Sequence, residues 1–482
     1  MAGRPAAVPE LSTTGFTSPS PVRNIYRDSI RSVAVYYGGH IRPTLMSQPG
    51  HSGSSGNSSS DSSSDQSNNS GCSSGSASAA AGADFSNAYE LTEIARRMTS
   101  HGFTRRMVQE FETGGADRAL ESWFFELDVD WVLQIREEQL QDRSASSHGE
   151  MIQRWIRALT VIVLSVKELV HQTPAVARLG KAGISAMLVF VNAVVPALKP
   201  ENLPAMVSMY ICVSSASCHM LTTPVIYPEA QSIFNEIGGS LSTQVDGLSE
   251  AIASTMEEMM TLMEDHDSWD TEIQRGRGEV HMNTRFMVNC IVEVSKARAS
   301  KHNTRDLQDL IDDTMDYLKD LLLKKSELCS DLSLGYLFLL NNYNFIAEVF
   351  EPSVSLDLEL WSGRHWRPTP ECEKYMYSYL QVSWGHVLSC IPKSNLPGPL
   401  HRWINTSSLA KFQSTFHKTY QAQKFWKVPD PRLRDELRKA ITARVISGYR
   451  DYLGEHPELE KHIGRESSPE VLEEMLAELF EG

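Results

Sequence analysis

The stretch FQSTFHKTYQAQKFWKVPDPRLRDELRKAITARVISGYRDYL, residues 412–453, carries the pattern that decides the fold. Apolar and aromatic residues recur every three or four positions on both sides of a Pro-Asp-Pro hinge, a period typical of amphipathic helices. Asp430 can accept hydrogen bonds from free backbone amides while Pro431 takes the first helical position. The stretch predicts two helices joined at the hinge, and none of its residues has the features of a catalyst.

The same helical period recurs in segment after segment from Asn87 onward. Met151–Val170 is apolar on most of its surface, which indicates a helix at the centre of a bundle. Sustained alternation of apolar and polar residues, the sign of a strand, is nearly absent. We therefore predict an all-α fold for residues 85–482, with a C-terminal bundle at about residues 392–482.

Residues 1–84 differ in composition from the rest, because His51–Ala83 is almost entirely Ser, Gly, Asn and Ala. Such a segment cannot bury enough apolar surface to offset the entropy lost on ordering, so we expect a disordered arm and tether. Within this range, Val22–Tyr37 has apolar side chains at roughly helical spacing. Two interpretations stay open for that piece: plain disorder, or a short peptide that folds on a partner.

Composition argues against several functional classes. The net charge of −15 argues against a nucleic-acid-binding surface over the whole protein, and the seven scattered cysteines form no C-x-x-C pair. The longest apolar run, Ile184–Leu198, is shorter than a membrane-spanning helix. Outside the Ser/Gly tether the sequence lacks the signature motifs of nucleotide-binding, zinc-dependent and serine-dependent enzymes. The acidic run Glu264–Asp270 has the pattern of a solvated loop, with a weak cation site as the alternative. We predict a protein that is not an enzyme and uses neither a metal nor another cofactor.

Charge is distributed unevenly near the C-terminus. Residues 401–450 hold eleven Lys and Arg against three carboxylates, whereas residues 451–482 hold two against ten. On a helical projection of residues 431–453, Arg432, Lys439 and Arg450 share the side opposite Leu433 and Ile441. This basic stripe has two interpretations: an ordinary solvated face, or a surface for anionic lipid headgroups or an acidic protein.

Seven blocks in order resemble the exocyst subunit of the seventy-kilodalton class, and the plant paralogues more than the animal or fungal forms. The blocks are ELTEIARRMTSHGF (90–103), IQRWIRAL (152–159), NTRFMVNCIVEV (283–294), LGYLFLLNNYNFIAEVF (334–350), YLQVSWGHVLSCI (379–391), FQSTFHKTYQAQKFWKVPDPRLRDELRKAI (412–441) and SPEVLEEMLAELFEG (468–482). Together they cover the chain from about residue 88 to its end.

The resemblance implies an elongated rod of stacked helical bundles. It also implies a non-catalytic subunit of the complex that tethers secretory vesicles to the plasma membrane during exocytosis. Such a subunit works in the cytoplasm, peripheral at the plasma membrane or secretory vesicles. The partners it implies are the other exocyst subunits, small GTPases and a membrane surface rich in phosphatidylinositol bisphosphate, but not nucleic acid.

Two departures from the family pattern modify these expectations. The family's N-terminal coiled coil would lie ahead of Asn87, where this sequence has the Ser/Gly tether and a short arm, so we predict that the coiled coil is absent. Where relatives have a Lys-aromatic-Ile-Lys run before the last helix, this chain reads KHIGR, with Lys461 in the first basic position, Gly464 in the second and Arg465 one place later. The departures motivate an alternative, a divergent adaptor that binds other proteins, for example in plant defence, outside the standard exocyst.

The candidate lipid-binding residues combine the two lines of reasoning. Lys461 and Arg465 come from the family motif, and Arg432, Lys439 and Arg450 come from the helical projection.

Overall fold

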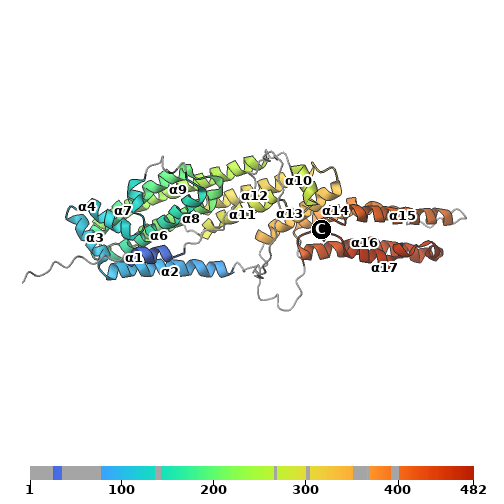
Figure 1. Ribbon diagram of the computed structural model, residues 1–482, viewed down its shortest axis with the longest axis horizontal. Coiled ribbons are helices and arrows are strands. Elements are labelled where there is room, and N and C mark those ends of the chain that lie inside the picture. Colours follow the sequence, from blue (N-terminus) through green and yellow to red (C-terminus); the bar gives the residue numbers. More distant parts are fainter. Residues whose placement is uncertain are drawn as a thin grey trace, which may run out of the picture. The chain divides into compact units, whose positions relative to one another are not determined.

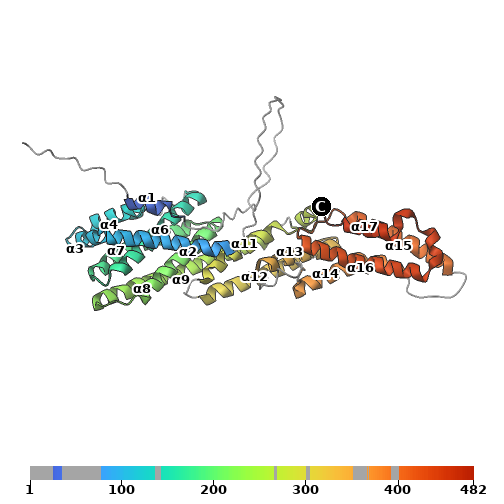
Figure 2. The same ribbon diagram turned by 90° about the horizontal axis from the view of Figure 1, so that it is seen from below.

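The computed structural model describes residues 25–34, 78–135, 140, 143–264, 269–299, 304–350, 366, 368–391 and 401–481. Within these ranges the chain is built from α-helices and short 3-10 helices, and the only β-type pairing there is an isolated bridge between Lys427 and Glu481. Helix follows helix along the sequence in both views (Figures 1 and 2). The predicted all-α fold class is confirmed.

The chain divides into two compact units, and the division runs through helices α8 and α9. Unit 1 takes in the ranges 1–36, 68–194 and 216–241, and unit 2 takes in 37–67, 195–215 and 242–482. The predicted domain limits near residues 84 and 392 do not coincide with this division and stay predictions.

Unit 1 is a bundle whose largest buried side chains include Trp123, Phe124, Trp155 and Phe190. Its elements, together with the two helices that continue into unit 2, are α1 (Ile25–Ser32), α2 (Ser78–Ser100), α3 (Phe103–Glu112), α4 (Ala116–Glu126), η2 (Asp130–Gln134), α6 (Ala145–Leu169), α7 (Ala175–Val194), α8 (Leu203–Thr222) and α9 (Pro228–Glu264).

Helix α6 is the central helix that the apolar run from Met151 to Val170 predicts. Ser144 caps its start, since the Ser144 hydroxyl accepts a hydrogen bond from the backbone amide of Ser147 at 3.3 Å. Trp155 is fully buried, and its indole N–H donates to the carbonyl of Met187 on α7 at 2.8 Å. This hydrogen bond satisfies the only donor of the indole, so burying Trp155 leaves no polar group without a partner.

Residues 25–34 depart from the predicted disordered arm. They contain α1, which packs against α2, α4 and α6 with Tyr26, Ile30 and Val33 buried. Three apolar side chains at helical spacing provide enough apolar area for this short piece to dock on its own chain. The rest of residues 1–77 lies outside the described residues, as does part of the acidic run at residues 265–268.

Two helical segments, Ala175–Ala197 and Pro200–Thr222, are long and apolar enough to cross a membrane by length and composition. The sequence prediction considered only the apolar run Ile184–Leu198, whereas the first segment begins nearer the N-terminus and the second lies after that run. In each, 56% of the most apolar window is buried inside the protein. A helix in the core of a protein shows burial of this kind, so the two segments are only weak evidence for a membrane-spanning helix.

Unit 2 is built around buried aromatic side chains such as Phe338, Tyr379 and Trp384. In addition to parts of α8 and α9, its elements are η3 (Val195–Ala197), η4 (Pro200–Asn202), α10 (Trp269–Gly276), α11 (Met282–Lys296), η5 (Ala297–Ala299), α12 (Thr304–Ser326), α13 (Leu332–Phe350), α14 (Pro370–Leu388), α15 (His401–Gln423), α16 (Pro431–Glu455), η6 (Pro457–His462), η7 (Arg465–Ser467) and α17 (Pro469–Ala477).

The predicted start of the helix that follows the Pro-Asp-Pro hinge is confirmed. The Asp430 carboxylate accepts from the backbone amides of Arg432 at 2.6 Å and Leu433 at 3.1 Å, with Pro431 at the first helical position of α16. The Ser468 hydroxyl accepts from the amide of Val471 and begins α17 in the same way. Local sequence therefore fixes where both helices begin.

The helices on either side of the hinge pack through aromatic side chains. Phe412 of α15 and Tyr449 of α16 are fully buried and stacked, with ring centroids 4.5 Å apart. The Tyr449 hydroxyl donates to the carbonyl of Ser467 at 3.1 Å. Arg444 of α16 is half-buried, and no described carboxylate forms an ion pair with it.

Candidate functional site

The C-terminal bundle presents all five candidate lipid-binding residues with exposed side chains. Three of them, Arg432, Lys439 and Arg450, lie on α16, whereas Lys461 is in η6 and Arg465 begins η7. Their neighbours differ, and this difference decides which charges are available to an external anion.

Arg432 is held by two carboxylates. Its guanidinium pairs with Glu348 of α13 and with Asp430, the latter at 3.2 Å. Burial raises the pKa of Glu348 to about 7, and its hydrogen bond with Asp430 adds to the rise. Burial alone would raise the pKa of Asp430 too, but the hydrogen bonds from Glu348, from the backbone amide of Leu433 and from Arg432 lower it to about 2. The two carboxyl groups share a proton near neutral pH, and Arg432 neutralises the remaining charge.

The other two residues of the stripe are paired as well. The Lys439 ammonium lies 2.8 Å from a carboxylate oxygen of Glu436, one turn earlier on α16. The Arg450 guanidinium lies 2.7 Å from Glu473 and 3.8 Å from Glu470, both on α17. The acidic C-terminal residues thus face part of the basic stripe instead of forming a separate negative tail.

Lys461 and Arg465 have a different environment. Both side chains are exposed, and within the part of the chain that the structure describes no carboxylate forms an ion pair with either. Gly464 between them has a φ of −65°, and a Cβ added there would meet nothing within 4 Å. The glycine is therefore not required by the backbone, and a longer side chain fits at this position.

A catalytic or metal centre finds no support among the described residues. No group of three or more His, Cys, Asp or Glu side chains there could hold a metal ion. Six of the cysteines lie in the described ranges, and all six are free thiols. Burial raises the pKa of Cys290 to about 12 and that of Cys329 to about 11, which keeps both protonated and poorly nucleophilic.

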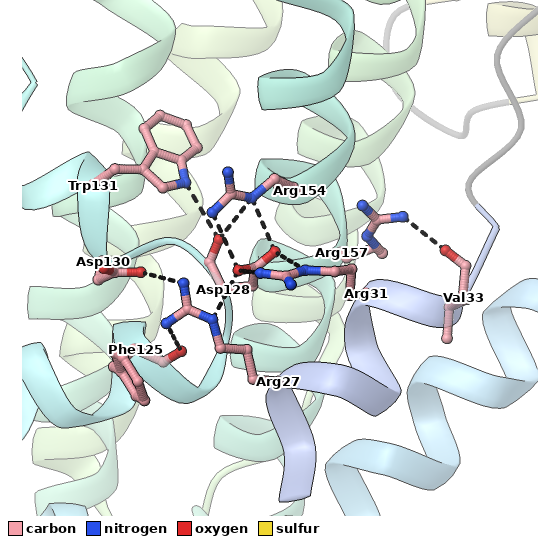
Figure 3. Close-up of polar contacts among 9 residues, drawn as sticks. All are labelled: Arg27, Arg31, Val33, Phe125, Asp128, Asp130, Trp131, Arg154 and Arg157. Carbon is pink, nitrogen blue, oxygen red and sulfur yellow. Dashed lines mark hydrogen bonds and ion pairs between the residues drawn. The ribbon is translucent and has the colours of Figure 1, made fainter. Parts of the chain in front are cut away.

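Sequence reasoning missed one polar cluster, which lies in unit 1. There Arg27 and Arg31 of α1 meet Asp128, just after α4 (Figure 3). The signal was the spacing of Arg27 and Arg31, four residues apart and next to buried apolar positions. Nothing local in the sequence marks Asp128 as their partner.

Comparisons with known proteins find similarity to exocyst subunits. Residues 292–478 match the family model that describes the C-terminal part of the Exo70 exocyst complex subunit. Exocyst complex component EXO70C1 of Arabidopsis thaliana is 29% identical over 171 residues, which are 33% of this chain and 25% of that protein. Exocyst complex component EXO70E2 of the same plant is 24% identical over 376 residues, 68% of this chain and 55% of that protein. The crystal structure of the S. cerevisiae exocyst component Exo70p is 12% identical, with a TM-score of 0.41 over 83% of this chain and 89% of that chain.

Among the described residues the helical fold defines the class of α-helical bundle proteins. Within that class, the chain is similar to the Exo70 exocyst subunits, in the matched C-terminal region and in the segments shared with the Arabidopsis relatives. The family resemblance of the seven sequence blocks is confirmed. The chain spans 25% to 55% of the length of these two Arabidopsis proteins.

Proposed function

We propose that this chain is a non-catalytic subunit of the exocyst and helps to tether secretory vesicles to the plasma membrane during exocytosis. The observation that carries the proposal is the match of residues 292–478 to the C-terminal part of the Exo70 family. The exposed, charged helix faces of the C-terminal bundle support a binding role, since they offer contact surface without a reactive group. Its partners would be the other exocyst subunits and small GTPases, and its place would be the cytoplasm, peripheral at the membrane.

The proposed membrane contact is centred on Lys461 and Arg465. These two side chains are exposed and lack an ion-pair partner among the described residues, so they can meet lipid phosphates without first breaking a bond. Arg432 and Arg450 would each have to give up two carboxylate contacts. An exposed ion pair contributes only about 0–1 kcal/mol, comparable to the roughly 1 kcal/mol that a cation gains near an anionic membrane. The stripe therefore contributes little net attraction, and the 461–465 segment contributes more.

Co-purification tests the exocyst role. The tagged full chain is co-expressed with the other subunits of a plant exocyst, and the purified complex is examined for stoichiometry. We expect recovery of the other subunits in near-equal amounts. The variant Lys461→Ala/Arg465→Ala serves as the matched control, because loss of a lipid contact should leave assembly in the complex unchanged.

The second candidate function is that of the divergent adaptor. Gly464 in place of the family's second lysine favours it, because a weaker lipid contact is what a protein released from membrane tethering would tolerate. A folded, monodisperse chain that recovers none of the other subunits would exclude the exocyst role and leave the adaptor.

A further inference from the structure

Helix α1 docks on unit 1 through one apolar face. Tyr26, Ile30 and Val33 are spaced four and three residues apart, and all three are buried. The Tyr26 ring lies 5.6 Å from the Phe103 ring, and its hydroxyl is 3.0 Å from Nδ1 of His101. These contacts lie within unit 1, on the surface made by α2, α4 and α6 together with the start of α3.

The neighbouring face of α1 carries two arginines that converge on one carboxylate. Arg27 Nε lies 3.0 Å and Arg31 Nη2 lies 2.6 Å from Oδ1 of Asp128 (Figure 3). Arg27 also pairs with Asp130 at 3.1 Å, donates to the carbonyl of Phe125 at 3.0 Å and lies over the Phe125 ring. Since Asp128 is 2% exposed, this carboxylate is largely inaccessible to competing water.

The receptor side of this contact is held in place without α1. Arg154 of α6 pairs with Asp128 Oδ2 at 2.9 Å, and Arg154 and the indole of Trp131 both donate to the Asp128 carbonyl. Asp128 has a φ of 63°, the left-handed region, where the turn after α4 directs its carboxylate toward the α1 surface. A further group, Arg157 of α6, donates to the carbonyl of Val33 at 2.8 Å and so binds the end of α1.

The bound helix cannot form alone. It has eight residues, and isolated helices shorter than about 12–15 residues are marginal in water. Its folding is therefore coupled to docking, so part of the contact free energy is consumed by ordering the segment. Because the contact is small and must also order α1, its affinity for α1 is low. The covalent connection between α1 and the rest of the chain compensates by raising the local concentration of α1.

We propose that the surface around Asp128 is a peptide-binding site for a short basic amphipathic helix, and that residues 25–34 are its exchangeable occupant, docked in cis. The recognised pattern is an aromatic residue at position 26, aliphatic residues at positions 30 and 33, and arginines at positions 27 and 31. The apolar residues fill the surface of α2, α4 and α6, and the arginines find the two carboxylates Asp128 and Asp130.

The test uses the full chain with a site-specific protease sequence inserted between Ser60 and Asp61. After cleavage, we expect the fragment that carries α1 to dissociate on dilution and to separate from the remainder of the chain in gel filtration, because the covalent link no longer raises its local concentration. A labelled peptide of residues 22–37 should then exchange into the site, as followed by fluorescence anisotropy. Circular dichroism should show that the remainder stays helical after exchange.

Competing peptides measure the recognition without altering the folded chain. A peptide with Arg27→Ala/Arg31→Ala should compete roughly tenfold or more weakly, because bonds to a buried carboxylate are lost. The control peptide with Ser32→Ala, which changes an exposed residue, should compete within about twofold. The Asp128→Asn variant removes the charge on the chain's side of the same contact. If this variant does not fold, the competing peptides alone test the recognition.

Four outcomes would overturn the proposal. The first is that the labelled peptide fails to enter the site, and the second is that the Arg27→Ala/Arg31→Ala peptide competes as well as the native one. Helicity is lost when the fragment leaves, which would make α1 an integral part of the fold. The uncleaved chain is a dimer that the Arg27→Ala/Arg31→Ala change dissociates, which would mean that α1 docks on a second copy.

Discussion

Arg450 of α16 and Glu473 of α17 form an ion pair, with Nη2 and Oε2 2.7 Å apart. The pair shows that a basic stripe read from the sequence is already partly neutralised inside its own bundle. Charge counts over residues 401–450 and 451–482 suggested two opposed patches, whereas the fold brings part of each against the other. The location of unpaired charge, rather than total charge, then decides the predictions on lipid binding.

Lys461→Ala/Arg465→Ala should weaken sedimentation with liposomes that contain phosphatidylinositol bisphosphate by roughly thirtyfold at low salt, from about 1 kcal/mol for each lost cation. Arg432→Ala/Lys439→Ala/Arg450→Ala should weaken it less, since its cations are engaged with carboxylates. The control Lys411→Ala/Lys418→Ala removes two exposed lysines of α15 and tests charge alone. An equal loss in all three variants would mean a diffuse basic surface, and no sedimentation of the native chain would exclude the lipid contact.

Gly464→Lys should strengthen the same sedimentation several-fold and leave thermal stability unchanged. The site is open and the backbone has an ordinary φ, so a lysine adds a third cation beside Lys461 and Arg465 without strain. Gly464→Gln, of similar length but neutral, is the matched control. A gain with Gln equal to that with Lys would show that charge is not the cause.

The Glu348 and Asp430 pair predicts a pH dependence of stability. The folded-state pKa of Glu348 is about 7, above the ordinary 4.5, so the folded chain binds more protons than the unfolded chain between these values. This contribution is complete below pH 4.5 and is lost as the pH rises through about 7. Because 35% of the Glu348 side chain is exposed, solvent screening limits the effect to about 1 kcal/mol.

Glu348→Gln isolates that effect, since glutamine keeps the shape and cannot ionise. The native chain should lose roughly 2–4 °C of melting temperature relative to the variant between about pH 5 and pH 7.5. Asp430 acts in the opposite sense, but its pKa of about 2 confines its contribution to more acidic solutions. If the melting temperatures of the two proteins changed by the same amount across this pH range, the prediction would be contradicted.

Gly180→Ala should destabilise unit 1 by about 1–3 kcal/mol, measured by urea unfolding. A Cβ at Gly180 of α7 would lie 2.8 Å from a methyl of Val166 on α6, closer than the two helices allow. Adding Val166→Ala should recover part of the loss, so the double change should cost less than the sum of the two single changes. The control Gly149→Ala, with nothing near its Cβ, should stabilise α6 by about 0.5–1 kcal/mol.

Phe412→Ala should destabilise the C-terminal bundle by about 3–5 kcal/mol, because it leaves a cavity beside the stacked Tyr449 ring. The matched control is Phe425→Ala, since 52% of Phe425 is exposed and its ring meets the cations of Arg277 at 5.4 Å and Lys424 at 4.7 Å. That change should cost no more than about 1 kcal/mol. Equal losses in urea unfolding would mean that the stack contributes little.

The helices were predictable because their signals are local. The period of apolar residues located α6 and α16, and Asp430 with Pro431 located the start of α16. The burial of Leu433, Leu437 and Ile441 also followed from spacing alone. The family resemblance likewise depended only on the order of sequence blocks.

Long-range pairing was not predictable in this way. Arg432 meets Glu348, 84 residues away, and Arg31 meets Asp128, 97 residues away. Basic residues at helical spacing are the sequence signal in both cases. On α16 they form a stripe that is paired with carboxylates, and on α1 they form a docking contact. Only the partner that the fold supplies separates the two cases.

The sequence by itself therefore determined the all-α class and the start of α16, because hydrophobic period and capping act between residues a few positions apart. The tertiary structure alone decided which cations are paired within the bundle and where α1 lies. Charges and docking surfaces depend on residues that are distant in the chain, and packing brings these together only once the helices have formed.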